Sequence, residues 1–380
     1  VEYLEARLLS AAGQVQTQAQ VAQVLESHYE LQGNWADWSA MKRVELAAQE
    51  DPWEKLELLK VIAATHEEKM EDMQGAFSAL AQAYAIDPSV DECRLNLERL
   101  ATSLGAWRPL VGVYESILEG EANESDATLT LLLRVAALYE TELEDPSGAV
   151  PAYQRVVELD DTNGIALGAL ERLLEGRGDL SALVDVLARE VELADDPARR
   201  EELLWRIARL WEEDLNRPDK AVVAYQRVYE ENPESIEALD ALGRLYRTAE
   251  NWSALTDVLR AKLEIVDDEV VSRKIRLQLA EIYDELLDDA DESVSCLRSV
   301  LEDSTTDAEV SARLEGLLGR EGRWEEVLEV LENREQGLDD AFAREQVEVQ
   351  IGQILDERLG QAEEAIERYA EVLRRTPEMG

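Results

Sequence analysis

Apolar residues recur along this chain at the spacing of one helical face. Leu204, Ile207, Ala208 and Trp211 fall at positions i, i+3, i+4 and i+7, so they lie on one side of an α-helix. The next segment, residues 216–219, contains a proline in the position where it can start a new helix. The pattern therefore predicts two helices joined by a short turn.

The second helix follows the same rule. Ala221, Tyr225 and Val228 share a face, and Pro233 ends the helix because proline cannot continue the backbone hydrogen bonding. Residues 202–233 are thus predicted to form a helical hairpin. A second hairpin with its own apolar faces is predicted over residues 236–267.

This pair of hairpins repeats at a step of 72 or 73 residues. One marker on the first helix recurs as Ile62, Val135, Ile207, Leu279 and Ile351. Another, at the start of the second helix of the alternate hairpin, recurs as Trp35, Trp107, Leu180, Trp252 and Trp324. The expected periods are 16–90, 91–163, 164–235, 236–307 and 308–380, and residues 1–15 form a partial preceding helix. A unit that cannot bury its apolar face alone must stack on copies of itself, which predicts one continuous array over residues 1–380.

The first kind of hairpin resembles the tetratricopeptide repeat family. The positions that carry the resemblance are Leu204, Ile207, Ala208 and Trp211 on the first helix and Ala221, Tyr225, Val228 and Pro233 on the second. The turn between the helices is one residue longer than is usual in the family. The resemblance implies an all-α fold, a right-handed α-solenoid of about ten helix-turn-helix hairpins.

The alternate hairpins depart further from the family pattern. Gly243 occupies a position where the family packs two helices closely, but the sister hairpins have a carboxylate there. These carboxylates belong to Glu26, Glu98, Glu171 and Glu315. A charged group at this place predicts either a looser helix crossing or a local shift of the buried face.

Charge excludes several classes of partner. The chain has 84 acidic and 38 basic residues, a net charge of −46. Such a charge repels nucleic acids and anionic membranes. No apolar run approaches the roughly 20 residues that span a bilayer, so neither nucleic-acid binding nor membrane insertion is expected.

Catalytic and metal-binding motifs are missing from the sequence. His28 and His66 are the only histidines, and neither has a second histidine or a cysteine at ligand spacing. No phosphate-binding glycine loop or nucleophile motif occurs. Residues 160–164 fit a turn with a helix cap better than a calcium loop. We therefore predict no catalytic, cofactor or metal site, and the chain is not expected to be an enzyme.

One ordered set of charges is a candidate partner-binding surface. An acid follows the aromatic position of the first helix in every period, at Glu67, Glu140, Glu212, Asp284 and Asp356. By resemblance these first helices line the concave surface. Arginines recur on the first helices of the alternate hairpins, at Arg99, Arg172 and Arg244. Either the acids form a stripe that attracts a basic peptide, or each acid pairs with an arginine of the adjacent first helix.

Trp205 is a second candidate, as an aromatic anchor for a ligand. Its counterparts in the other periods are Lys60, Leu133, Leu277 and Val349. Three of these four are apolar, which favours a packing role for this position.

The sequence thus predicts a non-enzymatic scaffold that binds a protein or peptide partner, with a basic partner expected. The alternative is a structural segment of a longer array whose ends stack on further repeats or on other copies. This alternative is motivated by the regular step and by ends that lack a polar capping unit. The compartment stays open.

Overall fold

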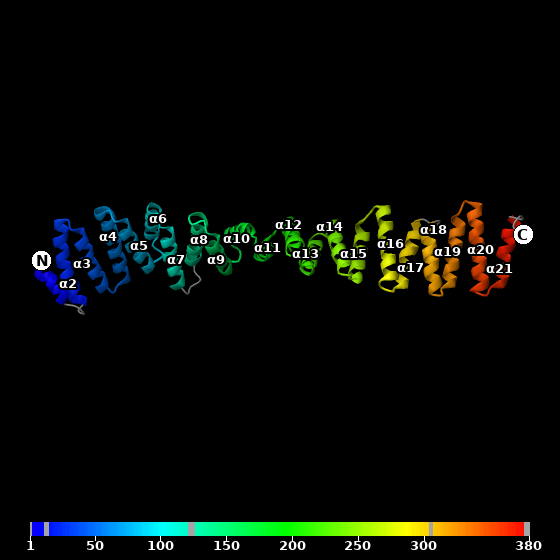
Figure 1. Ribbon diagram of the computed structural model, residues 1–380, viewed down its shortest axis with the longest axis horizontal. Helices are drawn as coiled ribbons and strands as arrows, with labels where there is room; N and C mark the ends of the chain where they lie inside the picture. Colours follow the sequence, from blue (N-terminus) through cyan, green and yellow to red (C-terminus); the bar gives the residue numbers. More distant parts are fainter. Residues whose placement is uncertain (1, 11–14, 121–125, 304–306, 376–380) are drawn as a thin grey trace. The chain divides into compact units, whose positions relative to one another are not determined.

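The computed structural model describes residues 2–10, 15–120, 126–303 and 307–375. Every regular element in these ranges is a helix, and consecutive helices pair as antiparallel hairpins in sequence order (Figure 1). Ten hairpins follow a single preceding helix. The predicted all-α class and the predicted number of hairpins are confirmed.

Contacts divide the chain into two compact units, Val1–Leu193 and Ala194–Gly380. The helices of the first unit are α1 (Glu2–Ser10), α2 (Val15–Gln32), α3 (Trp35–Ala48), α4 (Pro52–Met70), α5 (Met73–Ile86), α6 (Asp91–Leu104), α7 (Trp107–Gly120), α8 (Asp126–Thr141), α9 (Pro146–Leu159), α10 (Gly164–Arg177) and α11 (Leu180–Leu193). The tetratricopeptide-like hairpins here are α4–α5 and α8–α9, and the alternate hairpins are α2–α3, α6–α7 and α10–α11.

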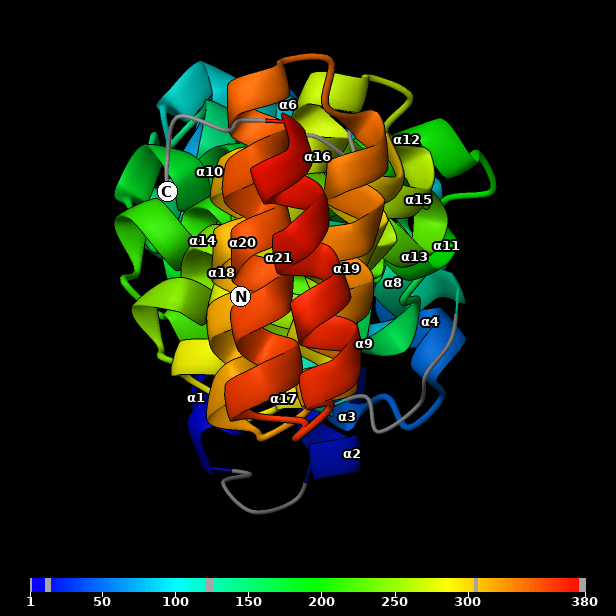
Figure 2. The same cartoon turned by 90° about the vertical axis from the view of Figure 1, so that its right-hand side faces the viewer.

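The helices of the second unit are α12 (Pro197–Arg209), η1 (Leu210–Asp214), α13 (Pro218–Glu231), α14 (Ile236–Thr248), α15 (Trp252–Ile265), α16 (Glu269–Glu285), α17 (Ala290–Asp303), α18 (Ala308–Arg320), α19 (Trp324–Gly337), α20 (Ala341–Glu357) and α21 (Ala362–Arg375). Within this unit each hairpin packs on the next, and α21 lies in front of the other helices in the view of Figure 2. The division falls between two hairpins, so every hairpin is intact within one unit.

Each of the ten hairpin turns contains one residue with a left-handed backbone. In the tetratricopeptide-like hairpins these residues are Glu71, Glu144, Asn216, Asp288 and Gly360, and in the alternate hairpins they are Gly33, Gly105, Gly178, Glu250 and Gly322. The left-handed residue reverses the chain at the helix C-terminus and lets following amides satisfy the last free carbonyls. The amide of Asp145, for example, donates to the carbonyl of Tyr139 over 2.8 Å.

The longer turn of the tetratricopeptide-like hairpins has a local cause. The helix ends in a wide bond in which an amide reaches the carbonyl five residues back, as in Leu215 to Leu210 over 2.9 Å. This geometry forms the π-helical turn η1, and Leu143, Leu287 and Leu359 make the same wide bond in their own copies. One extra residue is therefore accommodated before the second helix begins.

The ring at the aromatic position of the first helix lies against the second helix of the same hairpin. A Cβ atom at Gly148 would overlap the ring of Tyr139, whose hydroxyl is held by Glu115 at 2.8 Å. Gly75 has the same relation to His66. Glycine at these places lets the two helices approach around a ring.

Replacing the left-handed Glu250 by glycine should stabilise the protein. Glu250 has φ of 54° and an exposed side chain, and an L-residue in this conformation costs about 1 kcal/mol relative to glycine. We expect Glu250→Gly to raise the free energy of unfolding by about that amount in urea denaturation. Glu250→Ala keeps the Cβ and should give no such gain; equal gains from both variants would contradict the explanation.

Adding a methyl group at Gly148 should have the opposite effect. Gly148→Ala forces the Tyr139 ring or the helix to move, and such overpacking costs about 1–3 kcal/mol. Gly112 on α7 is the matched control, because open space surrounds its Cβ position. Gly112→Ala should be neutral or stabilising by thermal unfolding, since alanine is the better helix former. An equal loss in both variants would show that the ring contact is not the cause.

Candidate functional site

Four of the five ladder acids are held by an arginine from the following hairpin. The first pair joins Glu67 on α4 to Arg99 on α6. Two guanidinium nitrogens of Arg99 each donate to a different carboxylate oxygen of Glu67 over 2.7 Å. This two-bond geometry is the strongest form of a guanidinium–carboxylate contact.

The same pairing recurs once more in each unit. Arg172 Nη1 lies 2.6 Å from Glu140 Oε1 in the first unit. In the second unit both terminal nitrogens of Arg244 donate to Glu212, one of them over 3.1 Å. In all three pairs the arginine follows the acid by 32 residues, so the repeat itself sets the geometry.

The last two ladder acids differ. Asp284 pairs with Arg320, one helical turn beyond the glycine at the usual arginine position, over 2.6 and 2.7 Å. Asp356 on α20 is exposed, and no arginine among the described residues pairs with it. The sequence suggested three arginines for this ladder but not Arg320, which lies outside the repeated register.

Tyrosines of the second helices extend two of these pairs. The hydroxyl of Tyr153 donates to Glu140 over 3.1 Å, and that of Tyr225 donates to Glu212 over 2.8 Å. The arginine bond is the main cause that holds the pKa of Glu140 and of Glu212 below the ordinary value. Burial is the main cause that raises the pKa of Tyr225 to about 12.

The pairs present arginine rather than carboxylate to solvent. The side chain of Glu212 is 13% exposed, while that of Arg244 is 60% exposed. The same contrast holds for Glu140 and Arg172, at 20% and 61%. At the Glu140–Arg172 and Glu212–Arg244 pairs, guanidinium groups therefore cover the surface that was expected to be an acidic stripe. The local geometry is that of the ion-pair alternative.

Trp205 belongs to the same cluster as Glu212 and Arg244. Its half-buried ring meets the Tyr225 ring edge-on, with centroids 5.4 Å apart, and the guanidinium of Arg209 lies 5.7 Å from its centroid. Tyr225 in turn donates to Glu212. Three of the predicted site residues thus meet around one tyrosine, which the sequence reasoning had assigned only to packing.

Comparison with family models gives two matches, both described as tetratricopeptide repeat. They cover residues 202–235 and 238–269, which contain the Trp205–Tyr225–Glu212–Arg244 cluster. The chain thus contains tetratricopeptide repeats over these residues. The two matches fall on one hairpin of each kind, so the alternate hairpin over 238–269 is also a repeat of this family.

Three solved structures are similar to this chain. A structure of Naa15/Naa10 bound to HypK-THB shares 13% identity, with 97% of this chain and 67% of that chain covered, at a TM-score of 0.29. A tetratricopeptide repeat protein from Parabacteroides merdae shares 15% identity, covering 69% of this chain and 98% of that one, at 0.27. MamA shares 19% identity, covering 43% and 91%, at 0.24. No curated protein sequence matches the chain.

Three carboxylates of the alternate repeats, Glu26, Glu98 and Glu315, also have a cationic partner. Glu98 accepts two bonds of 2.9 Å from Arg134 on the next hairpin and one of 3.2 Å from the Tyr114 hydroxyl. Glu26 pairs with Lys42 at 2.7 Å. Where Gly243 replaces the carboxylate, the leucine and valine side chains of α15 approach directly, because no charged group has to be accommodated. The sequence pattern gave the acids but not their cations, which lie on other helices.

His66 lies in a buried, hydrogen-bonded position. His66 is buried, and its ring nitrogens lie 2.7 Å from the Ser39 hydroxyl and 2.8 Å from the Asp72 carboxylate. Both ring nitrogens are thus engaged, and the ring has a structural role. Within the described ranges no group of three metal-ligating side chains occurs, and no helix is both long and apolar enough to cross a membrane.

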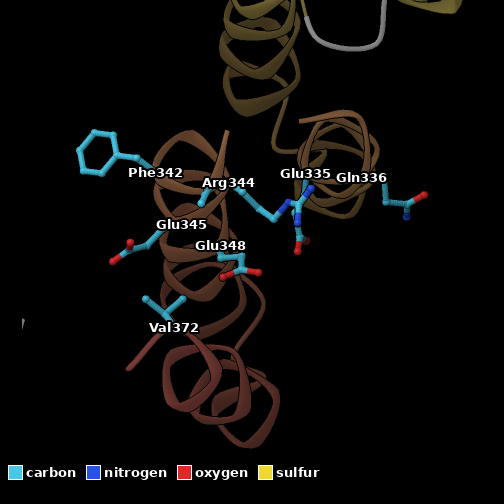
Figure 3. Close-up of a pocket in the computed structure, with 8 residues that line it drawn as sticks. Glu335, Gln336, Phe342, Arg344, Glu345, Glu348 and Val372 are labelled. Carbon is cyan, nitrogen blue, oxygen red and sulfur yellow. The ribbon is translucent and has the colours of Figure 1, made fainter. Parts of the chain in front are cut away.

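A hollow of about 760 Å³ lies among α19, α20 and α21 of the second unit (Figure 3). Glu335, Arg344 and Glu348 line it, and the ring of Phe342 points away from these carboxylates. Arg368 donates to Glu335 over 3.0 Å, and burial together with Glu348 raises the pKa of Glu335. Arg344 donates to the Leu338 carbonyl, so it and Glu335 both have partners within the repeats.

Removing one ladder carboxylate should cost stability in a pH-dependent way. The pKa of folded Glu212 lies below its ordinary value of 4.5, so its contribution is complete above that pH and disappears as the pH falls through the lower folded value. We expect Glu212→Gln to lose about 1 kcal/mol at pH 7 and progressively less in acid.

The matched control is Asp356→Asn, which removes the ladder acid that lacks an arginine. This variant should leave the free energy of unfolding unchanged at pH 7. Urea denaturation of both variants between pH 3 and pH 7 checks the prediction. A pH-independent loss for Glu212→Gln, or equal losses for both variants, would contradict the ion-pair explanation.

Proposed function

We propose that this chain is a non-enzymatic scaffold that binds a protein partner along the first helices of its repeats. Tetratricopeptide repeats generally mediate protein–protein interaction, and the described residues offer no set of groups suited to catalysis. The observation that carries the proposal is a regular series of three ion pairs, which we call rungs: Glu67–Arg99, Glu140–Arg172 and Glu212–Arg244. Their half-exposed guanidinium groups recur on α6, α10 and α14 at the same register.

The rungs support binding because their guanidinium groups keep hydrogen-bond donors that the paired carboxylates do not use. A guanidinium group has five N–H donors, and a two-bond contact with a carboxylate uses two of them. The side chains of Arg99, Arg172 and Arg244 are 48%, 61% and 60% exposed, so their unused donors can hydrogen-bond carbonyl groups of a partner backbone. Half-buried Trp205 adds apolar contact area beside the Arg244 rung.

Net charge favours a basic partner. Each ion pair uses one acid and one cation, so the pairs leave the excess of 46 negative charges in place. This excess accelerates the approach of a positively charged protein and repels acidic ones. Because Glu67, Glu140, Glu212 and Asp284 already hold arginines, basic side chains of the partner would meet other acidic side chains of the chain.

A photo-crosslinking residue can locate the bound partner. Gly168 is exposed on α10, one turn before Arg172, and its Cβ position is open. Asp185 is the control position, because it is exposed on α11, the second helix of the same hairpin. We expect crosslinking of a basic protein from position 168 and not from position 185. The yield should fall strongly between 0.05 and 0.5 M NaCl, because salt screens the attraction.

Two results would contradict the proposal. Crosslinking from position 185 alone would place the partner on the second helices. A crosslinked partner whose yield is the same at both salt concentrations would show that the negative charge does not drive the association.

A further inference from the structure

Two hollows lie on either side of α6 in the first unit. One, of about 500 Å³, lies between α4 and α6, and its lining includes the buried side chains of Leu80 and Cys93. The other, of about 540 Å³, lies between α6 and α8, and its lining includes buried Tyr84 and Leu131. Both volumes fall within the range of pockets that bind ligands.

Exposed apolar side chains stand beside these hollows. Val61 of α4 lines the α4–α6 hollow and is 47% exposed. Leu95 of α6, the helix between the two hollows, is 57% exposed. Half-buried Leu133 of α8 lines the α6–α8 hollow. These three side chains belong to the first helices of three successive hairpins.

The repeat itself does not require Val61 or Leu95. The equivalent positions in other copies are polar or small: Arg134, Arg206, Gln278 and Gln350 for Val61, and Gln23, Gly168, Asp240 and Ala312 for Leu95. A large apolar residue is therefore not needed at either place to pack the hairpin. Exposed apolar residues gathered beside hollows are typical of interaction sites, which favours contact with a partner as their role.

The lining of the α4–α6 hollow has an excess of negative charge. It contains four carboxylates and two cations, a net charge of −2, from Glu57, Glu67, Glu68 and Glu92 against Lys60 and Arg99. Glu67 is held by Arg99, and Lys60 is shared between Glu57 and Glu92, whereas Glu68 is exposed. The lining of the α6–α8 hollow contains two acids and two arginines, so it is neutral. A basic group of a ligand is therefore attracted to the α4–α6 side.

The spacing of the hollows suits one extended segment. The Glu67–Arg99 and Glu98–Arg134 ion pairs join α4 to α6 and α6 to α8, and these helices follow one another along the first unit (Figure 1). Neighbouring helices lie about 10 Å apart. A polyproline-II segment advances about 9 Å in three residues, which returns its side chains to the same side. Side chains at positions i and i+3 can thus enter both hollows.

We propose that the hollows on either side of α6 bind an extended basic segment of the partner protein, with large apolar side chains at positions i and i+3. One apolar side chain contacts Val61 and Leu95, and the other contacts Leu133. A lysine or arginine beside the first meets Glu68. The backbone carbonyls of such a segment make no internal hydrogen bonds, so they can accept from Arg99. This inference rests on the proposed function, because it names the segment that the first-helix surface recognises.

A second copy of this chain is a poorer occupant. Each copy carries the same excess of 46 negative charges, so two copies repel each other. The same repulsion disfavours acidic peptides. The charge of the α4–α6 hollow therefore selects a basic segment of another protein.

A labelled synthetic peptide tests the site. The probe carries two leucines three residues apart, each flanked by lysine, and fluorescence anisotropy measures its binding to the full chain. We expect saturable binding that Val61→Gln or Leu95→Ala weakens about five- to tenfold, since each removes apolar surface from the contact. Both substitutions introduce a residue that another copy carries, so the fold should be retained. Val223→Gln is the matched control, because Val223 is 56% exposed on α13 of the second unit, and it should leave binding unchanged.

The charge contribution has its own variants. Glu68→Gln should weaken binding of the probe about two- to fivefold, the range of a partly exposed ion pair. Glu158→Gln removes an exposed acid of α9 and should leave binding unchanged. A peptide with serine in place of the first leucine should bind the wild-type chain more weakly, and Val61→Gln should cause little further loss with this peptide.

Several results would overturn the two-hollow site. These are absence of saturable binding, equal affinity for the wild-type, Val61→Gln and Leu95→Ala proteins, or equal binding of a peptide with glutamate in place of lysine. Dimerisation of the chain that Leu95→Ala abolishes would assign the hollows to a second copy and overturn it as well. A basic protein that crosslinks from position 168 with the same yield in Leu95→Ala would refute the two hollows but keep the proposed function.

Discussion

The structure depends on the burial of each second helix beneath the first helix of the next hairpin. Val294 on α17, for example, is 4% exposed and shares a core cluster with Val310 and Leu314 of α18, so the following hairpin covers an apolar side chain of this one. At roughly 25 cal/mol per Å² of apolar surface, this burial is the main favourable contribution at each step of the stack. The ion pairs from Glu67 to Arg99 and from Glu212 to Arg244 cross the same junctions and fix the register.

Sequence periodicity was sufficient for the architecture because both kinds of hairpin keep helical spacing of apolar residues. It placed the ten hairpins and the tryptophans that open α3, α7, α15 and α19. It did not show the left-handed turn residues, since five of the ten are not glycine. Backbone geometry at Glu144 or Glu250 is imposed by packing of the two helices, and the residue type does not reveal it.

The candidate site was predicted in part. The repeated acids and three arginines were visible because the repeat places both at constant positions, and the two alternatives for them followed from that spacing. Arg320 and Arg134 were missed because each makes its contact from a position that the repeat does not share. The tyrosines were visible only as packing residues, because their hydroxyl bonds to Glu140 and Glu212 depend on how closely the second helix approaches.

Amide hydrogen exchange tests the central claim most directly, because it reports the local free energy of opening for each helix. If the following hairpin supplies most of the stability at each junction, amides of α21 should exchange much faster than those of α17, α13, α9 and α5. Protection in α21 equal to that of these equivalent helices would contradict the account, since it would show that a single hairpin is stable without its neighbour.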